Sequence, residues 1–196
     1  MIIGILGSGQ LGRMLAIAAA QLGIKTHIFA PDASTSPAGD IAFAATEAAY
    51  DDHDALVRFA NSVDVITSEF ENVPATTLDI LAIHKNVSPG IAALHTAQHR
   101  IREKTLARDL GIDTPDFWHI TDALSLHSAM AELNKDGILK TCTLGYDGKG
   151  QAKISPISDF DATFASLESD DVILEDMIPF VAEASFLIAR ARDGRA

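Results

Sequence analysis

A lysine followed by a glycine-rich loop is the segment of this sequence best suited to hold a triphosphate. Lys140 closes an apolar stretch, and the loop from Gly145 to Gly150 carries three glycines and a second lysine, Lys149. Glycines free the backbone and expose N–H donors, while the lysines supply positive charge. The order of lysine and glycines differs from that of a Walker A loop. The segment predicts a mobile cover over phosphates, with an ordinary glycine-rich hairpin as the alternative.

A second glycine motif opens the chain. Gly7 to Gly12 matches G-x-G-x-x-G between an expected strand and an expected helix, and Asp32 lies twenty residues beyond Gly12. This spacing is the fingerprint of dinucleotide binding. A helix N-terminus binds other phosphates equally well, and glycines also serve turns and close packing. The motif alone therefore leaves open NAD(P), another phosphorylated ligand or a purely structural role.

Polar groups also follow two other expected strands. Glu71 and Asn72 come after one of them, and ligands bind at the carboxyl ends of strands in doubly wound sheets. The segment 175–178 ends another strand, with Glu183 close behind, and it could present backbone groups to an adenine and a carboxylate to ribose hydroxyls. The alternatives are solvated charged turns, with Asn72 capping the helix that follows.

Other reactive side chains give weaker patterns. His95 and His99 have the i, i+4 spacing of a zinc pair, but no third ligand is evident and H-E-x-x-H is absent. Cys142 has no indicated base beside it. We expect two surface histidines and a small, unreactive cysteine side chain.

The composition is that of a globular protein without nucleic-acid or membrane partners. The chain has 196 residues, 47% of them hydrophobic, with 27 acidic against 15 basic side chains and a net charge of -12. Nucleic-acid binders show the opposite balance. No apolar run approaches the ~20 residues that span a bilayer, and the first residues lack the basic region of a signal peptide. The single cysteine excludes an internal disulfide and favours a reducing cytoplasm.

Strand and helix patterns alternate along the chain, which predicts an α/β fold with a doubly wound, Rossmann-like parallel sheet. After Thr114 and Pro115 the pattern changes to α+β. Strands are expected at 2–6, 26–30, 63–67, 138–141, 152–154 and 172–175, and helices at 10–22, 52–60, 74–84, 96–110, 122–134 and 159–167.

The last residues predict half of a hairpin. Residues 183–192 alternate like a strand, and Asp193-Gly194 is a strong turn signal. A second strand would have to follow, because native proteins avoid bare sheet edges. We expect this chain to be a fragment of a longer protein.

Four motifs occur here in the order in which they occur in one family. They are Gly7 to Met14, Glu69 to Pro74, Gln98 to Lys104 and Gly145 to Gln151. Together they resemble the PurK family, the 5-(carboxyamino)imidazole ribonucleotide synthases, also known as the ATPase subunit of phosphoribosylaminoimidazole carboxylase. The similarity runs along essentially the whole chain.

The resemblance implies an ATP-grasp carbon-nitrogen ligase of purine biosynthesis in the cytoplasm. Such enzymes use ATP and bicarbonate, through carboxyphosphate, to carboxylate the exocyclic amine of 5-aminoimidazole ribonucleotide. It also implies a pre-ATP-grasp domain at 1–97 and an incomplete ATP-grasp domain at 98–196. The family's Mg²⁺ ligands are expected beyond residue 196, so this fragment should not turn over, and the full-length protein could form a homodimer.

The resemblance assigns site residues and shows departures. The first glycine loop would face the nucleotide substrate. Ser8 stands where many members have glycine, and Cys142-Thr143-Leu144 stands where members often carry arginine and glycine. ATP contacts are implied for Arg100, Lys140, Gly145, Tyr146, Asp147, Gly148, Lys149, Gly150, Gln151, Glu175, Asp176, Met177, Ile178 and Glu183, and substrate contacts for Gly9, Gln10, Leu11, Glu71 and Asn72.

Three alternatives stay open. A sister ATP-grasp enzyme, such as the formate-dependent glycinamide ribonucleotide transformylase, would differ in its substrate. An NAD(P)-dependent oxidoreductase would use the first glycine motif and leave the second loop without a role. A non-catalytic nucleotide-binding module would bind ATP without chemistry.

Overall fold

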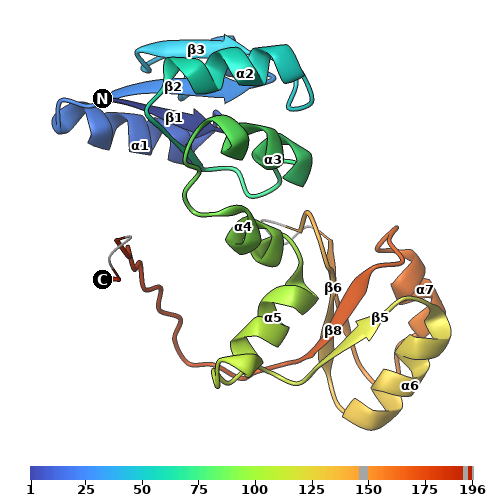
Figure 1. The fold of residues 1–196 in the computed structure, drawn as a ribbon. Helices are drawn as coiled ribbons and strands as arrows, with labels where there is room; N and C mark the ends of the chain where they lie inside the picture. Colours follow the sequence, from blue (N-terminus) through green and yellow to red (C-terminus); the bar gives the residue numbers. More distant parts are fainter. Residues whose placement is uncertain (146–149, 192–193, 196) are drawn as a thin grey trace. The chain divides into compact units, whose positions relative to one another are not determined.

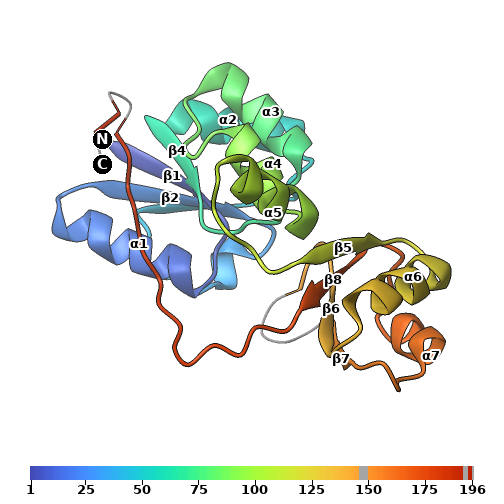
Figure 2. The ribbon, with the colours of Figure 1, turned by 90° about the horizontal axis from the view of Figure 1, so that it is seen from below.

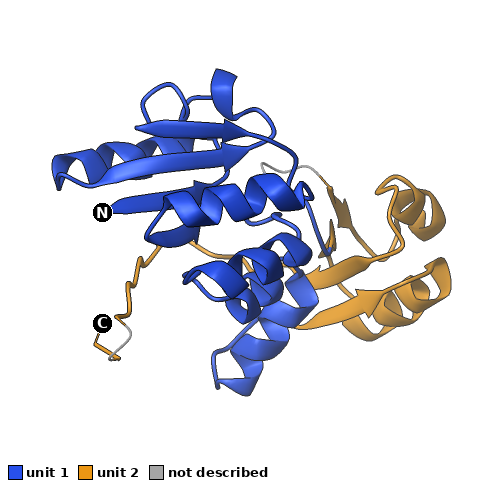
Figure 3. Ribbon diagram, turned by 45° about the horizontal axis from the view of Figure 1, so that its top comes forward, with its two compact units in different colours: residues 1–114, 142–147 blue, residues 115–141, 148–196 orange. Residues whose placement is uncertain are grey.

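The computed structural model describes residues 1–145, 150–191 and 194–195. The chain forms two compact units, coloured separately in Figure 3. Unit 1 comprises Met1–Thr114 and Cys142–Asp147, and unit 2 comprises Pro115–Thr141 and Gly148–Ala196. Among the described residues, no helix is both long and apolar enough to cross a membrane.

Unit 1 is built on a parallel sheet with the strand order β3-β2-β1-β4. Every pair of neighbouring strands is parallel. From β1 the sheet continues through β2 to β3 on one side, and β4 lies on the other side of β1. The predicted doubly wound parallel sheet is therefore confirmed. Its strands are β1 (Ile2–Leu6), β2 (Lys25–Ala30), β3 (Ala44–Glu47) and β4 (Val65–Ser68).

Helices cover both faces of this sheet. Figure 2 shows α1 (Gln10–Gln21) on one face and α2 (His53–Ser62) and α3 (Ala75–His84) on the other. Successive residues of a strand point to opposite faces, so Leu6 packs in the core beneath α2 and α3 while Ile5 joins the smaller cluster on the opposite face. Cover on both faces of the sheet explains why β1 is a continuous apolar run.

The expected helix at 96–110 is wrong, because two helices occupy this region. The first is α4 (Ile91–Ala97) and the second is α5 (Arg100–Asp109). His99 between them has an extended backbone, with φ -142° and ψ 116°. No glycine or proline stands at this break, so the sequence pattern predicted one continuous helix across it. His95 and His99 consequently do not share a helix.

Unit 2 contains an antiparallel sheet with the strand order β5-β8-β6-β7 (Figure 2). Three of these strands, β5, β6 and β8, are also labelled in Figure 1. Two helices, α6 (Ala123–Leu133) and α7 (Phe160–Ala165), contribute to a single apolar core with one face of this sheet. The expected change to α+β is therefore present. The strands are β5 (Phe117–Ile120), β6 (Gly137–Thr141), β7 (Gln151–Ile154) and β8 (Val172–Asp176).

The predicted and the observed strands differ at two short edge strands and at one extended segment. The sequence patterns missed β3 and β5, which have only four residues each and lie at sheet edges. The expected strand at 183–192 is wrong for the described residues 183–191, which form no strand in the structure. An extended segment becomes a strand only when another strand takes its N–H and C=O groups. Val181, just before this segment, and Leu187 within it are fully exposed.

Candidate functional site

The carboxyl edge of the parallel sheet in unit 1 holds a hollow of about 460 Å³. It lies where β1, β2 and β4 end, because parallel neighbours bring their carboxyl ends to the same edge. This is the position where doubly wound folds bind their ligands. The hollow is lined by Gly7, Ser8, Gly9, Pro31, Asp32, Tyr50, Glu69 and Phe70.

A carboxylate of the protein itself occupies the first glycine loop. The N–H of Gly9 donates to Glu69 Oε1 at 2.7 Å, at the start of α1. Gly7 has φ +100°, and a Cβ added there would lie 2.6 Å from the same Oε1. Glycine is therefore required at position 7 for both its backbone conformation and the approach of Glu69. The loop directs an N–H to an internal anion where dinucleotide-binding folds direct theirs to phosphate.

The remaining groups of this hollow are also acidic or uncharged. The Ser8 hydroxyl donates to Asp32 Oδ1 at 2.5 Å. Burial, followed by the negative charges of Asp32 and Glu69, raises the pKa of Tyr50 to about 12. Tyr50 also stacks on Phe70, with the ring centroids 6.5 Å apart. None of the described lining residues is basic, so the hollow suits hydroxyl or amine donors better than phosphate.

A second hollow of unit 1, about 250 Å³, unites residues from both predicted sets. Glu71 and Asn72 come from the predicted substrate contacts, and Arg100 and Gly145 come from the predicted ATP contacts. They converge because the loop after β4, the start of α5 and the segment after β6 meet within this unit. The complete lining is Glu71, Asn72, Ala97, Gln98, Arg100, Glu103, Cys142, Thr143, Leu144 and Gly145.

Arg100 holds the segment before the glycine-rich loop. Its backbone N–H donates to the carbonyl of Cys142 at 3.0 Å, and its guanidinium donates to the carbonyl of Gly145 at 2.7 Å. Arginine suits this task because its planar group offers several donors in a fixed geometry. The first residue of α5 thereby positions the entrance of the predicted phosphate cover. Tyr146, Asp147, Gly148 and Lys149 lie outside the described residues.

The triplet that departs from the family pattern has an unusual backbone. Leu144 adopts φ +60°, a left-handed conformation that costs a residue with a Cβ roughly 1–2 kcal/mol. Its side chain is 66% exposed and lines the 250 Å³ hollow. The leucine therefore places both strain and an apolar surface beside Gly145.

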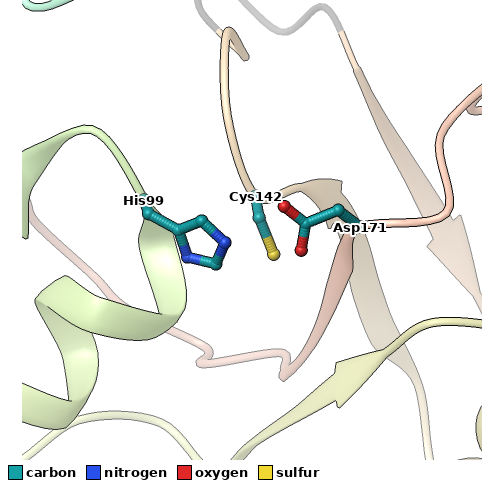
Figure 4. A group of neighbouring side chains, drawn as sticks. All are labelled: His99, Cys142 and Asp171. Carbon is teal, nitrogen blue, oxygen red and sulfur yellow. The ribbon is translucent and has the colours of Figure 1, made fainter. Parts of the chain in front are cut away.

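Cys142 has a neighbouring imidazole that the sequence did not reveal. Figure 4 shows the ring of His99 directed toward the sulfur of Cys142, and their ligand atoms lie within 4.8 Å. The sequence did not indicate this base, because His99 lies 43 positions before Cys142, at the break before α5. Cys142 is only 1% exposed, which limits its access to reagents. Asp171, also labelled in Figure 4, belongs to unit 2 and contacts His119 Nε2 at 2.8 Å.

Three predicted ATP contacts of unit 2 lie together on neighbouring strands. Lys140 Nζ is 2.9 Å from Glu175 Oε2, and Gln151 is the register partner of Lys140 on β7. Gly150, just before β7, accepts the N–H of Thr141 at 2.8 Å. The predicted lysine and carboxylate therefore form an ion pair across β6 and β8.

The other predicted residues lie further from these contacts or on the surface. Asp176 pairs with Lys135 at 2.7 Å, and Met177 and Ile178 are partly exposed after β8. Glu183 is exposed in the extended segment. Gln10 and Leu11 are exposed in the first turn of α1, although Gly9 lines the 460 Å³ hollow.

Several lining residues of these hollows were absent from the predicted contacts. Glu69 and Gln98 begin two of the family motifs, but the sequence did not reveal their partners, because each contacts a segment distant in sequence. Tyr50 gave no local signal. Asp32 was noted for its spacing, and it accepts a hydroxyl from Ser8. Asn72 does not cap α3, which starts after Pro74 without a side-chain cap.

The chain begins with a parallel sheet that carries a glycine loop. An antiparallel sheet with a lysine–glutamate ion pair follows. This order of sheets is the one expected for the ATP-grasp class. Residues 1–98 match the family described as ribonucleotide synthetase preATP-grasp domain, and residues 105–196 match the ATP-grasp domain. The chain belongs to the PurK family of ATP-grasp proteins.

The relatives show the extent of this likeness. The chain is 44% identical over 194 residues to the N5-carboxyaminoimidazole ribonucleotide synthase of Brucella melitensis, covering 98% of this chain and 53% of that protein. For the Pseudomonas aeruginosa protein of the same name, identity is 42%, covering 99% and 53%. The chain spans about half the length of these curated relatives.

Solved structures agree with this assignment. The structure of the Staphylococcus aureus N5-carboxyaminoimidazole synthetase complexed with ADP matches with a TM-score of 0.84 and 33% identity. The match covers 90% of this chain and 47% of that one.

Proposed function

We propose that this chain carries the nucleotide-binding part of a ligase that uses ATP and bicarbonate to carboxylate the amine of 5-aminoimidazole ribonucleotide. The observation that carries the proposal is the 250 Å³ hollow, where Glu71 and Asn72 meet Arg100 and Gly145. The names of the relatives and the ADP-bound neighbour support the same assignment. Residues 1–97 would serve the ribonucleotide, and residues 98–196 would serve ATP, in the cytoplasm.

In this proposal the protein binds, orients and shields the reactants. Arg100 and Lys140 place positive charge beside the ATP phosphates, and the segment from Gly145 to Gln151 covers them and excludes water. The segment 175–178 and Glu183 contact adenine and ribose. Such positioning makes the attack of the amine on carboxyphosphate effectively intramolecular.

The first glycine loop serves the ribonucleotide substrate in this proposal. Gly9, Gln10 and Leu11 would contact it, and the acidic hollow beside Gly9 accepts donors from a sugar or an amine. Glu69 already accepts the Gly9 N–H, which argues against a dinucleotide pyrophosphate at this loop. The amine to be carboxylated is itself a donor, in agreement with an acidic surrounding.

Magnesium is the ion that ATP chemistry of this class requires. Such an ion is held by one or two carboxylates together with the ATP phosphates, and it would neutralise the charge on those phosphates. A homodimer of the complete protein also remains a proposal.

Calorimetric titration tests the proposal. We expect the chain to bind ATP and 5-aminoimidazole ribonucleotide, and to bind neither NADH nor glycinamide ribonucleotide. Lys140→Met and Arg100→Met should each weaken ATP binding about tenfold, since each removes a charged contact to phosphate. Binding of NADH with no response to ATP would refute the assignment.

A further inference from the structure

We propose that Gln98 is a positioning residue, which holds the loop of residues 71–73 in place beside Arg100. This inference rests on the proposed function, since the loop carries two predicted substrate contacts, Glu71 and Asn72. Gln98 holds these two residues in position and does not itself contact the reacting atoms.

The side chain of Gln98 clamps the loop at two points. Its Nε2 donates to the carbonyl of Glu71 at 2.7 Å and to the carbonyl of Val73 at 2.8 Å. A side-chain amide nitrogen has two hydrogens, so both are used on this loop. The clamped carbonyls stand on either side of Asn72, which fixes the backbone that carries its side chain.

The ends of the loop are secured in other ways. Val73 is fully buried in the unit 1 core, and Pro74 precedes α3. At the other end, the Ser68 hydroxyl donates to the carbonyl of Phe70 at 2.7 Å. Glu71 itself is exposed, so its position depends on the clamp.

Gln98 also lies only two residues before Arg100, a predicted ATP contact that lines the same hollow. Its own N–H ends α4 by donating to Leu94 at 2.9 Å. Two residues later, Arg100 holds the carbonyls of Cys142 and Gly145. The connection between α4 and α5 therefore contacts both sides of the 250 Å³ hollow and sets the separation between them.

Gln98→Met tests the role, since methionine has a similar length and no donor. Because this variant loses both hydrogen bonds to the loop, the occupancy of the held conformation should fall by about tenfold or more. Gln98→Glu should behave in the same way, because an ionised carboxylate donates nothing. Gln21→Met is the matched control, an exposed glutamine at the end of α1.

Two measurements read the result. We expect Gln98→Met to raise the Kd for 5-aminoimidazole ribonucleotide about tenfold and to leave the Kd for ATP within about twofold. Cleavage after Glu71 by a glutamate-specific protease should become about tenfold faster, because the scissile carbonyl is the one that Gln98 holds. The Gln21→Met control should match the unsubstituted chain in both.

Equal weakening of both ligands, or of neither, would overturn the inference. If the unsubstituted chain binds neither nucleotide, the proposed function fails, and the protease measurement decides the role of Gln98 by itself. Unchanged cleavage after Glu71 in Gln98→Met would then exclude the clamp.

Discussion

Lys140 Nζ and Glu175 Oε2 lie 2.9 Å apart across the neighbouring strands β6 and β8. The register pairs Lys140 with Ile173, so Glu175 stands two residues further along and on the same face. The side chain of Glu175 is 8% exposed and that of Lys140 is 22% exposed. Removal from water strengthens such a pair and makes the loss of either partner costly.

Glu175→Ala should lower the free energy of unfolding by about 2 kcal/mol, because it leaves the ammonium group of Lys140 poorly solvated. Because Lys140 is partly exposed, this loss of stability should be smaller than for a fully buried pair. Asp161→Ala is the control, since Asp161 is 74% exposed and its partner His127 is 53% exposed, and its loss should cost under about 1 kcal/mol. Urea unfolding measures both, and equal losses would contradict the expectation.

Stability should fall at alkaline pH because of Tyr50. Burial and the charges of Asp32 and Glu69 raise its folded-state pKa from 10.0 to about 12. The phenol contributes fully below pH 10, and this contribution is lost as pH rises from 10 toward 12, when only the unfolded state ionises. The loss is at most about 2 kcal/mol after solvent screening. Urea midpoints between pH 9 and 12 measure it.

Tyr50→Phe provides the comparison for this pH dependence. Phenylalanine keeps the aromatic stack with Phe70 and has no proton to lose. The difference in stability between the two proteins should shift in favour of Tyr50→Phe above pH 10. Parallel pH profiles for the two proteins would show that Tyr50 titrates normally.

Leu144→Gly should be more stable than Leu144→Ala by about 1 kcal/mol. Only glycine adopts the left-handed backbone of this position without penalty, as its φ of +60° requires. Leu22, which is also exposed but has φ -93°, should show the opposite order, with alanine more stable than glycine. Chemical denaturation of the four variants checks the prediction, which fails if both positions prefer alanine.

Gly7→Ala should destabilise unit 1 by about 2–3 kcal/mol. The new Cβ would meet Glu69 Oε1 at 2.6 Å and Phe70 Cβ at 2.8 Å, on a backbone with φ +100°. Gly23→Ala separates the cost of the backbone conformation from that of the steric clash, because Gly23 has φ +71° and nothing within 4 Å of the new atom. It should lose only about 1 kcal/mol. Thermal unfolding of both variants measures the difference.

Local patterns in the sequence were sufficient for the two-sheet architecture. Apolar runs predicted the central strands β1 and β2, and helical spacing predicted α1, α2 and α6, because burial of a whole face leaves a periodic mark. The glycine and proline positions placed most boundaries within a few residues. The four-residue strands β3 and β5 were missed, whereas β4 and β7, which are also four-residue strands at sheet edges, were predicted.

By itself the sequence determined the parallel sheet, the family resemblance and the two glycine segments, because these depend on residue types at short, regular spacing. Only the tertiary structure decided that Glu69 takes the Gly9 N–H, that Lys140 faces Glu175, and that Gln98 clamps the loop before α3. Each of these contacts joins residues at least 25 positions apart, where no local period carries information. The packing of strands and helices selects such pairs, and the charge and hydrogen-bonding capacity of the side chains then stabilise them.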